Sequence, residues 1–184
     1  MTNWQIKLLA HRLRDGGVIA YPTETVYGLG CDPLNSSAVA RLLTIKQRAP
    51  DKGFILIASD YAQLSPYLEA DKHLRKRVKR STVEPVTWLL PASANAPAWI
   101  TGSHNSVAVR ITTHPLAAQL CRAFGGAIVS TSANLSGRPP ARKEWQVRRI
   151  LGTVLDDILV GQSGPFKKPS EIRDAMTGHV IRQA

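Results

Sequence analysis

The stretch Val18-Ile19-Ala20-Tyr21-Pro22-Thr23-Glu24-Thr25-Val26-Tyr27-Gly28-Leu29-Gly30 joins an apolar segment directly to a polar loop that contains two glycines. Residues 18–21 predict a short buried strand that ends at Pro22, because proline cannot donate to a sheet ladder. The hydroxyls, the carboxylate and the glycines that follow suit a close approach of the backbone to a small ligand. An ordinary turn explains the segment by itself equally well. The stretch therefore predicts a strand that leads into a candidate binding loop.

Apolar strands and amphipathic helices alternate on both sides of this stretch. Further strands are expected at 54–57, 86–90, 106–111 and 127–130, with short ones near 158–160, 170–173 and 179–182. Helices are expected over 4–14, from caps at 35–37 to Lys46, from 59–60 onward, within 72–80, over 113–124 and over 144–151. Strands joined by crossover helices indicate an α/β sandwich around one sheet, and the short C-terminal strands make that sheet mixed. A chain of 184 residues fits a single domain over 1–184.

The chain is strongly basic, with 24 Lys and Arg against 13 Asp and Glu, a formal charge of +11. This balance points to polyanions as partners: nucleic acid, nucleotides or an anionic membrane surface. Six of the cations lie between Lys72 and Arg80 with no acid among them. The run reads as a helix with a narrow apolar stripe, and a solvated helix face is favoured over a nucleic-acid contact.

Several protein classes are excluded by motifs that the chain lacks. Gly28-Leu29-Gly30 is followed by Pro33 where the dinucleotide fingerprint needs its third glycine, and the chain has no P-loop motif and no Ser-His-Asp signature. Cys31 and Cys121 are far apart and the histidines have no metal-ligand spacing, so we expect a reducing cytoplasm and no protein metal site. We expect no secretory leader at the N-terminus and, because of its prolines and polar residues, no membrane span over 85–109.

The segment Lys46-Gln47-Arg48-Ala49-Pro50-Asp51-Lys52-Gly53 is a second candidate binding loop, between a helix and a strand. Three cations within seven residues, held by proline and glycine, could grip phosphates, with arginine binding in a bidentate manner. The preference of a helix C-terminus for positive charge explains Lys46 and Arg48 equally well, but hardly Lys52.

The segment Ser130-Thr131-Ser132-Ala133-Asn134-Leu135-Ser136-Gly137 is a third candidate, at the end of an apolar strand. Its hydroxyls and its amide could contact a ligand, since ligands of α/β sheets collect outside the carboxyl ends of strands. A capped loop with no ligand remains open as the alternative.

In combination, five motifs resemble the YrdC-like family, the threonylcarbamoyl-AMP synthases, in its short bacterial form. They are PTETVYGLG (22–30), the Lys-x-Arg of KQR (46–48), VAVRITTHP around Arg110, STSANLSG (130–137) and KPSEIRD (168–174). The resemblance runs from about Gly16 to Arg182. It implies a twisted open α/β sandwich with a large, basic, concave cavity.

The resemblance also implies a reaction. Such enzymes condense L-threonine, bicarbonate and ATP into threonylcarbamoyl-adenylate and pyrophosphate, and they use Mg²⁺ with the ATP and no organic cofactor. Their product supplies the t6A modification at position 37 of tRNAs that read codons beginning with A. The implied partners are separate tRNA threonylcarbamoyltransferase proteins, because no transferase domain fits in this chain.

Residue roles follow from the resemblance, position by position. The implied catalytic residues are Lys46, Arg48, Ser132 and Asn134. The implied ATP-binding residues are Arg48, Lys52, Ser106, Ser132, Ser170 and Arg182. The implied threonine-binding residues are Thr25, Arg110 and Ser130, with Arg110 pairing with the carboxylate of threonine. No residue is implied as a dedicated metal ligand.

The chain departs from the usual family pattern at Ala49, at Lys52, at Val83-Glu84-Pro85 and at Pro140.

Two other functions stay open: an RNA-binding module that uses the basic cavity without making adenylate, and a carbamoyl hydrolase on the same fold. Only 6% of the residues are aromatic, and the chain lacks RRM and KH signatures, which disfavours the RNA module. Weak tRNA binding through the run 72–80 is an additional expectation that is compatible with a synthase.

Overall fold

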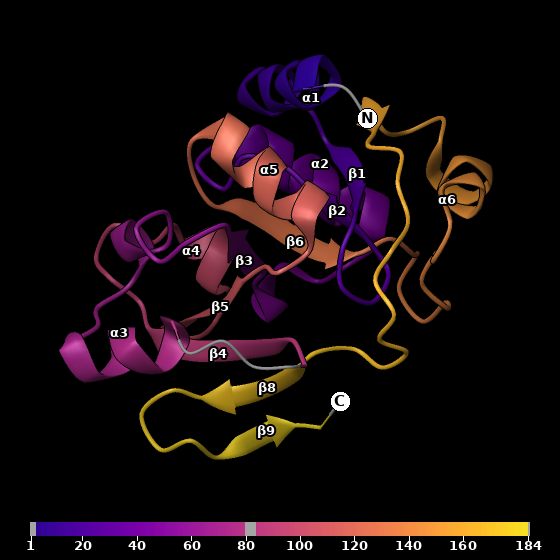
Figure 1. Cartoon of the computed structure of the whole chain (residues 1–184). Coiled ribbons are helices and arrows are strands. Elements are labelled where there is room, and N and C mark those ends of the chain that lie inside the picture. Colours follow the sequence, from indigo (N-terminus) through magenta and orange to yellow (C-terminus); the bar gives the residue numbers. More distant parts are fainter. Residues whose placement is uncertain (1–2, 80–83, 184) are drawn as a thin grey trace.

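The computed structural model describes residues 3–79 and 84–183, and within them the strands form one nine-stranded sheet, in the order β7-β1-β2-β6-β3-β5-β4-β8-β9 (Figure 1). The strands are β1 (Ile19–Pro22), β2 (Tyr27–Gly30), β3 (Ile55–Ala58), β4 (Val86–Pro91), β5 (Ser106–Ile111), β6 (Ile128–Ser132), β7 (Asp157–Ile158), β8 (Glu171–Asp174) and β9 (Val180–Arg182). The helices are α1 (Asn3–Arg14), α2 (Ser36–Lys46), α3 (Lys72–Lys79), α4 (Ala98–Thr101), α5 (Pro115–Phe124) and α6 (Glu144–Leu151), with short 3-10 turns at Pro50–Lys52 and Ser65–Tyr67.

The sheet is mixed, as the sequence predicts. Strand β3 pairs with β5, β4 with β8 and β1 with β7 in parallel, whereas the remaining neighbours are antiparallel. None of the helices in the described ranges has the length and apolar character that a membrane crossing needs.

The two faces of the central strands are covered differently, because successive side chains point to opposite faces. One face carries Leu56, Val109 and Val129, which are buried in a large core together with apolar residues of α2. On the other face, Ile57 and Ile128 are buried against α1 and α5. Figure 1 shows these two helices packed together above the same end of the sheet. They leave the rest of that face uncovered.

Small side chains line the uncovered part of this face. Ser106, Ala108 and Arg110 alternate along β5, and Ile55 of β3 pairs with both Ala108 and Ser130. Next to them, Gly28 of β2 pairs with Ser132 of β6. Serine, alanine and glycine fill little volume, so the sheet face itself forms the floor of a hollow.

Most elements lie within one or two residues of the predicted positions, but two were missed and one was wrong. Strand β2 was predicted to be a loop, because glycine is uncommon in strands. Its glycines allow close packing: a side chain at Gly30 would lie 2.3 Å from the Val129 carbonyl oxygen, and one at Gly28 would press on the Tyr21 ring. The short helix α4 was also not predicted.

The helix expected from Ser59-Asp60 onward is not formed, and that prediction was wrong. The Asp60 carboxylate accepts a hydrogen bond from the Ala62 amide at 2.8 Å, which closes a local turn instead. Pro66 then prevents a helix from continuing, so the chain forms only the 3-10 turn at Ser65–Tyr67. Arg80 of the basic run and Val83 of the Val83-Glu84-Pro85 departure lie outside the described residues.

Candidate functional site

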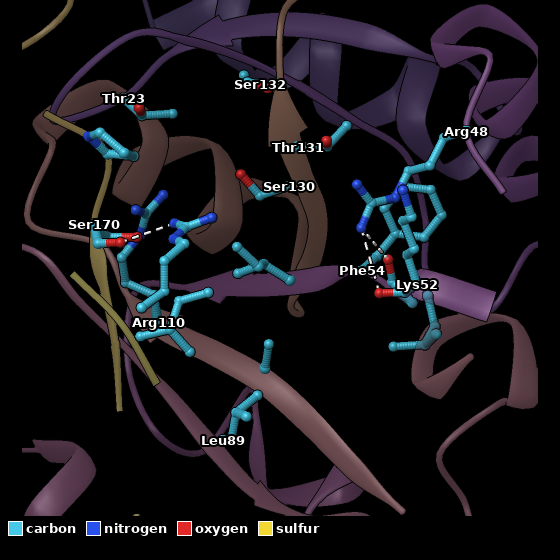
Figure 2. A pocket seen from close by; sticks show the side chains of 18 of the residues that line it. Thr23, Arg48, Lys52, Phe54, Leu89, Arg110, Ser130, Thr131, Ser132 and Ser170 are labelled. Carbon is cyan, nitrogen blue, oxygen red and sulfur yellow. Dashed lines mark hydrogen bonds between the residues drawn. The ribbon is translucent and has the colours of Figure 1, made fainter. Parts of the chain in front are cut away.

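A cavity of about 450 Å³ lies over the uncovered sheet face (Figure 2). Its floor comes from strands β2, β3, β5 and β6, and its sides come from the segments around 23–26, 48–54, 101–104 and 169–172 and from β9. Nine of the eleven residues predicted for the site line it: Thr25, Arg48, Lys52, Ser106, Arg110, Ser130, Ser132, Ser170 and Arg182. The cavity therefore gathers motifs that are far apart in the sequence.

Arg48 and Lys52 form one cationic end of the cavity. Helix α2 ends at Gln47, whose positive φ of 48° turns the chain sharply out of the helix. Arg48 Nη2 donates to the Gly53 carbonyl oxygen at 2.9 Å, and its guanidinium lies 5.4 Å from the centre of the Phe54 ring. These contacts fix the plane of the guanidinium, and burial lowers the pKa of Arg48.

Arg110 and Arg182 form the other cationic end of the cavity. In Figure 2 Arg110 lies across the cavity from Arg48 and close to Ser170. Arg110 is only 7% exposed. Arg182, from the outer strand β9, donates to the Ser170 carbonyl oxygen at 2.9 Å. Partial burial and, next, the charge of Arg110 lower the pKa of Arg182. Two guanidiniums that repel one another in this way would be stabilised by an anion between them.

A row of hydroxyls joins the two ends. Ser130, Thr131 and Ser132 follow one another along β6 and line the cavity; in Figure 2 Ser130 and Thr131 lie between Arg110 and Arg48, and Ser132 lies farther along the strand. Among the described lining residues there is no aspartate or glutamate. A site with cations at both ends and neutral donors between them suits a ligand, or a pair of ligands, with anionic groups some distance apart.

Lys46 and Asn134 lie behind this row and not on the cavity lining. The ammonium of Lys46 donates to the Ser132 carbonyl oxygen at 2.5 Å, to the Asn134 carbonyl oxygen at 2.6 Å and to Asn134 Oδ1 at 2.8 Å. The same Oδ1 accepts from the Ser132 hydroxyl at 2.6 Å. In this arrangement Lys46 uses its three N–H donors to hold the loop that presents Ser132, so a direct phosphate contact by Lys46 stays a prediction.

This tether predicts an alkaline limit to nucleotide binding. Burial and, next, the charge of Arg48 lower the pKa of Lys46 to about 8. A lowered lysine pKa means that the proton is lost as the pH rises through that value, and a neutral amine keeps only two donors for three acceptors. We expect the Kd for ATP to rise roughly tenfold between pH 7 and 9.5, as the loop that carries Ser132 loosens.

Calorimetric titration of ATP into the protein at several pH values measures this directly. Lys46→Met should bind ATP weakly at every pH, without a break near 8. A wild-type Kd that stays constant to pH 9.5 would show that the charge of Lys46 does not matter for the site.

Several lining residues were not singled out from the sequence. Phe54 was read only as a strand residue, and nothing in its sequence context points to a ring beneath an arginine. His104 also lines the cavity, from the turn that follows α4. The hydroxyls of Thr23 and Thr131 were included among the candidates of their two segments, but neither residue was given a role of its own.

The basic run lies apart from this cavity. Its helix α3 packs near β4 in Figure 1, and none of the described residues of the run lines the cavity. Arg75 and Lys79 lie over the Tyr61 ring at 5.3 and 6.0 Å from its centre, and Arg77 donates to the Met176 carbonyl oxygen. Part of the charge of this run therefore serves local packing.

The mixed sheet and its cation-flanked cavity define an α/β protein with a candidate binding site for anionic groups. The model of the Sua5_yciO_yrdC family, described as "Telomere recombination", matches residues 11–184. The chain belongs to this Sua5/YciO/YrdC family.

Individual relatives agree with this assignment. A "Threonylcarbamoyl-AMP synthase" of Alkalilimnicola ehrlichii is 58% identical over 182 residues, which cover 97% of this chain and 95% of the relative. One of the same name from Nitrosococcus oceani is 53% identical over 98% of both chains. Among solved structures, P. abyssi Sua5 complexed with L-threonine superposes with a TM-score of 0.88 at 32% identity, over 95% of this chain and 52% of Sua5. E. coli YciO superposes with a TM-score of 0.86 at 27% identity, over 99% of this chain and 90% of YciO.

Proposed function

We propose that this chain is a threonylcarbamoyl-AMP synthase, a nucleotidyltransferase that makes threonylcarbamoyl-adenylate and pyrophosphate from L-threonine, bicarbonate and ATP. The observation that carries the proposal is the pair of cationic ends, Arg48 with Lys52 and Arg110 with Arg182, joined by the hydroxyls of β6. The reaction needs such a site, because two anionic substrate groups, the carboxylate of an amino acid and the triphosphate of ATP, must bind close together. The names of relatives that match nearly the full length of the chain support the same activity.

The chemistry requires placement and not a covalent nucleophile. The amine of threonine takes up CO₂ from bicarbonate as a carbamate, with loss of water. A carbamate oxygen then attacks the α-phosphorus of ATP, the bond to the β-phosphate breaks, and pyrophosphate leaves. Charge accumulates on the transferring phosphoryl group and on the leaving group, where fixed cations and hydroxyl donors are most effective.

The proposed roles follow the two ends of the cavity. Arg48 and Lys52 would bind the phosphates of ATP, and the Ser132 hydroxyl would turn from Asn134 Oδ1, to which it donates at 2.6 Å, to the transferring phosphoryl group. At the other end Arg110 would pair with the carboxylate of threonine. Further contacts to threonine are proposed for Thr25 and Ser130, and further contacts to the nucleotide for Ser106, Ser170 and Arg182. Lys46 and Asn134 would support catalysis by holding Ser132 in place.

Mg²⁺ is proposed to enter with ATP. The described lining offers hydroxyls and no carboxylate, and the described residues contain no cluster of three His, Cys, Asp or Glu side chains. Such a donor set fits a metal held mainly by phosphate oxygens, to which a lining hydroxyl or water could add. The ion would neutralise phosphate charge, while Arg48 and Ser132 orient the phosphates.

The proposal extends to the fate of the product. Threonylcarbamoyl-adenylate would pass to separate tRNA threonylcarbamoyltransferase proteins for t6A formation, in the cytoplasm. Two free, buried cysteines, Cys31 and Cys121, support a reducing compartment. An RNA-binding module that makes no adenylate accounts less well for a cavity in which an arginine such as Arg110 is almost completely buried.

The test is amino-acid-dependent release of pyrophosphate from ATP in the presence of bicarbonate. L-Threonine should support release, whereas its methyl ester, which lacks the anionic carboxylate, should not. Release that is independent of the amino acid, or equal with the ester, would contradict the proposed arrangement.

A further inference from the structure

Glu24 is a buried carboxylate placed directly behind the Arg110 end of the cavity. It is 3% exposed and does not belong to the cavity lining, unlike its neighbours Thr23 and Thr25. The family resemblance implies no role for Glu24. Several hydrogen bonds and one ion pair fix the position of its carboxylate.

The two oxygens of Glu24 have different surroundings. Oε1 accepts hydrogen bonds from the Thr112 hydroxyl at 2.5 Å, from the Thr113 amide at 2.9 Å and from the His114 amide at 3.3 Å. Oε2 is buried, has no hydrogen-bond partner among the described residues, and lies 3.7 Å from Arg110 Nη2. One oxygen therefore anchors the turn after β5, and the other faces the guanidinium.

The distance of 3.7 Å between Glu24 and Arg110 decides what the pair can do. It is too long for a hydrogen bond, yet short enough for a strong Coulomb attraction in a buried place. Arg110 thus gains a compensating charge without using its donors, and its Nε has no partner among the described residues. A guanidinium held in this way can offer its donors to an incoming carboxylate.

Glu24 also joins the two walls that would hold threonine. Its own backbone belongs to the loop that carries Thr25, whereas its side chain is fastened to residues 112–114, which directly follow the strand that carries Arg110. From the other side, the Gly164 amide donates to the Thr23 carbonyl oxygen at 2.8 Å, and a side chain at Gly164 would lie 2.4 Å from the Glu24 carbonyl oxygen. The loop is therefore clamped between β5 and the segment around Gly164.

We propose that Glu24 is a positioning residue for the amino-acid substrate: through Arg110 and the 112–114 turn, it sets the orientation of the carboxylate-binding guanidinium and its distance from Thr25. This inference rests on the proposed function, because it takes threonine as the ligand at this end. The inference adds a residue that affects the binding of L-threonine and does not affect the binding of ATP.

Two physical effects of Glu24 on threonine binding have opposite signs. As a negative charge near a carboxylate site, Glu24 repels the ligand, so its neutralisation by itself would tighten binding. As a support for Arg110, it favours binding, so its neutralisation would weaken binding. The second effect should dominate, because an unsupported guanidinium next to Arg182 would be misaligned, whereas a ligand in the cavity, which Glu24 does not line, would be farther from Glu24 than Arg110 is.

The test is Glu24→Gln, which keeps an oxygen for Thr112 and the backbone amides but removes the charge facing Arg110. We expect the KM for L-threonine to rise about tenfold or more, while kcat at saturating threonine and the KM for ATP change less than threefold. Calorimetric titration should show the same selective loss of threonine affinity and an unchanged Kd for ATP. Thr112→Val, which removes one donor to Glu24, should move the KM for threonine in the same direction by a smaller factor.

Asp156→Asn is the matched control. The Asp156 carboxylate also accepts from a backbone amide, that of Val18 at 2.7 Å, and pairs with an arginine, Arg41 at 2.6 Å, outside the cavity lining. The Asp156→Asn variant should leave the KM for L-threonine and the KM for ATP unchanged.

Three outcomes would overturn the inference: a lower KM for threonine in Glu24→Gln, equal losses for both substrates, or no change in either. A wild-type protein without synthase activity would instead refute the proposed function.

Discussion

Replacement of Arg48 by alanine is expected to lower kcat/KM for ATP by about a thousandfold, the scale seen when a fixed donor to a charged transition state is removed. The guanidinium is held by the Gly53 carbonyl oxygen and by the Phe54 ring, so it meets the phosphates without first having to be ordered. Steady-state release of pyrophosphate measures the loss. Arg48→Lys should recover only part of it, because an ammonium can neither bind in a bidentate manner nor stack in the same way.

The matched control for Arg48 is Arg149→Ala. Arg149 is exposed on α6 and does not line the cavity. This variant should keep wild-type kinetics, and circular dichroism and thermal unfolding of Arg48→Ala should match those of the wild type. Near-normal turnover by a folded Arg48→Ala protein would show that the phosphates bind elsewhere.

Replacement of Arg110 by methionine is expected to raise the KM for L-threonine by about a hundredfold or more, because the carboxylate of the substrate would lose its charged partner. The Kd for ATP should change little, since the phosphates are assigned to the opposite end of the cavity. Calorimetry with each substrate in turn separates the two affinities.

Methionine leaves the Glu24 charge buried without its partner, and this will also reduce stability. Arg110→Lys retains a charge opposite Glu24 and therefore serves as the folded comparison. Its KM for threonine should lie between those of the wild type and Arg110→Met. Equal losses of ATP and threonine affinity in both variants would contradict the division of the cavity into two ends.

The general architecture could be predicted because it depends on local patterns. Apolar runs such as 106–111 show a strand directly, and period-two alternation places Ser106, Ala108 and Arg110 on one face. The rule that ligands collect at strand ends then points to the loops after Tyr21 and Val129. These inferences need only short stretches of sequence. The structure confirms the strands β1, β5 and β6, but the cavity lies over the face of the sheet and not beyond the strand ends.

The features that were missed depend on contacts between distant residues. Nothing in the sequence indicated that the Lys46 ammonium holds the Ser132 and Asn134 carbonyl oxygens, and only the fold shows these contacts. The strand character of Gly28 and Gly30 depends on the ring of Tyr21 and on the neighbouring strand. The role inferred for Glu24 likewise requires the turn at 112–114, nearly ninety residues away along the chain. No local pattern could have revealed these pairings.

The most direct test of the central claim is detection of the product itself. The purified protein is incubated with ATP, Mg²⁺, L-threonine and ¹³C-bicarbonate, and the mixture is analysed at once by mass spectrometry. Threonylcarbamoyl-adenylate that carries one ¹³C atom, formed together with pyrophosphate and absent without threonine, is the result expected here. Absence of any labelled adenylate, under conditions in which a known synthase forms it, would contradict the assignment.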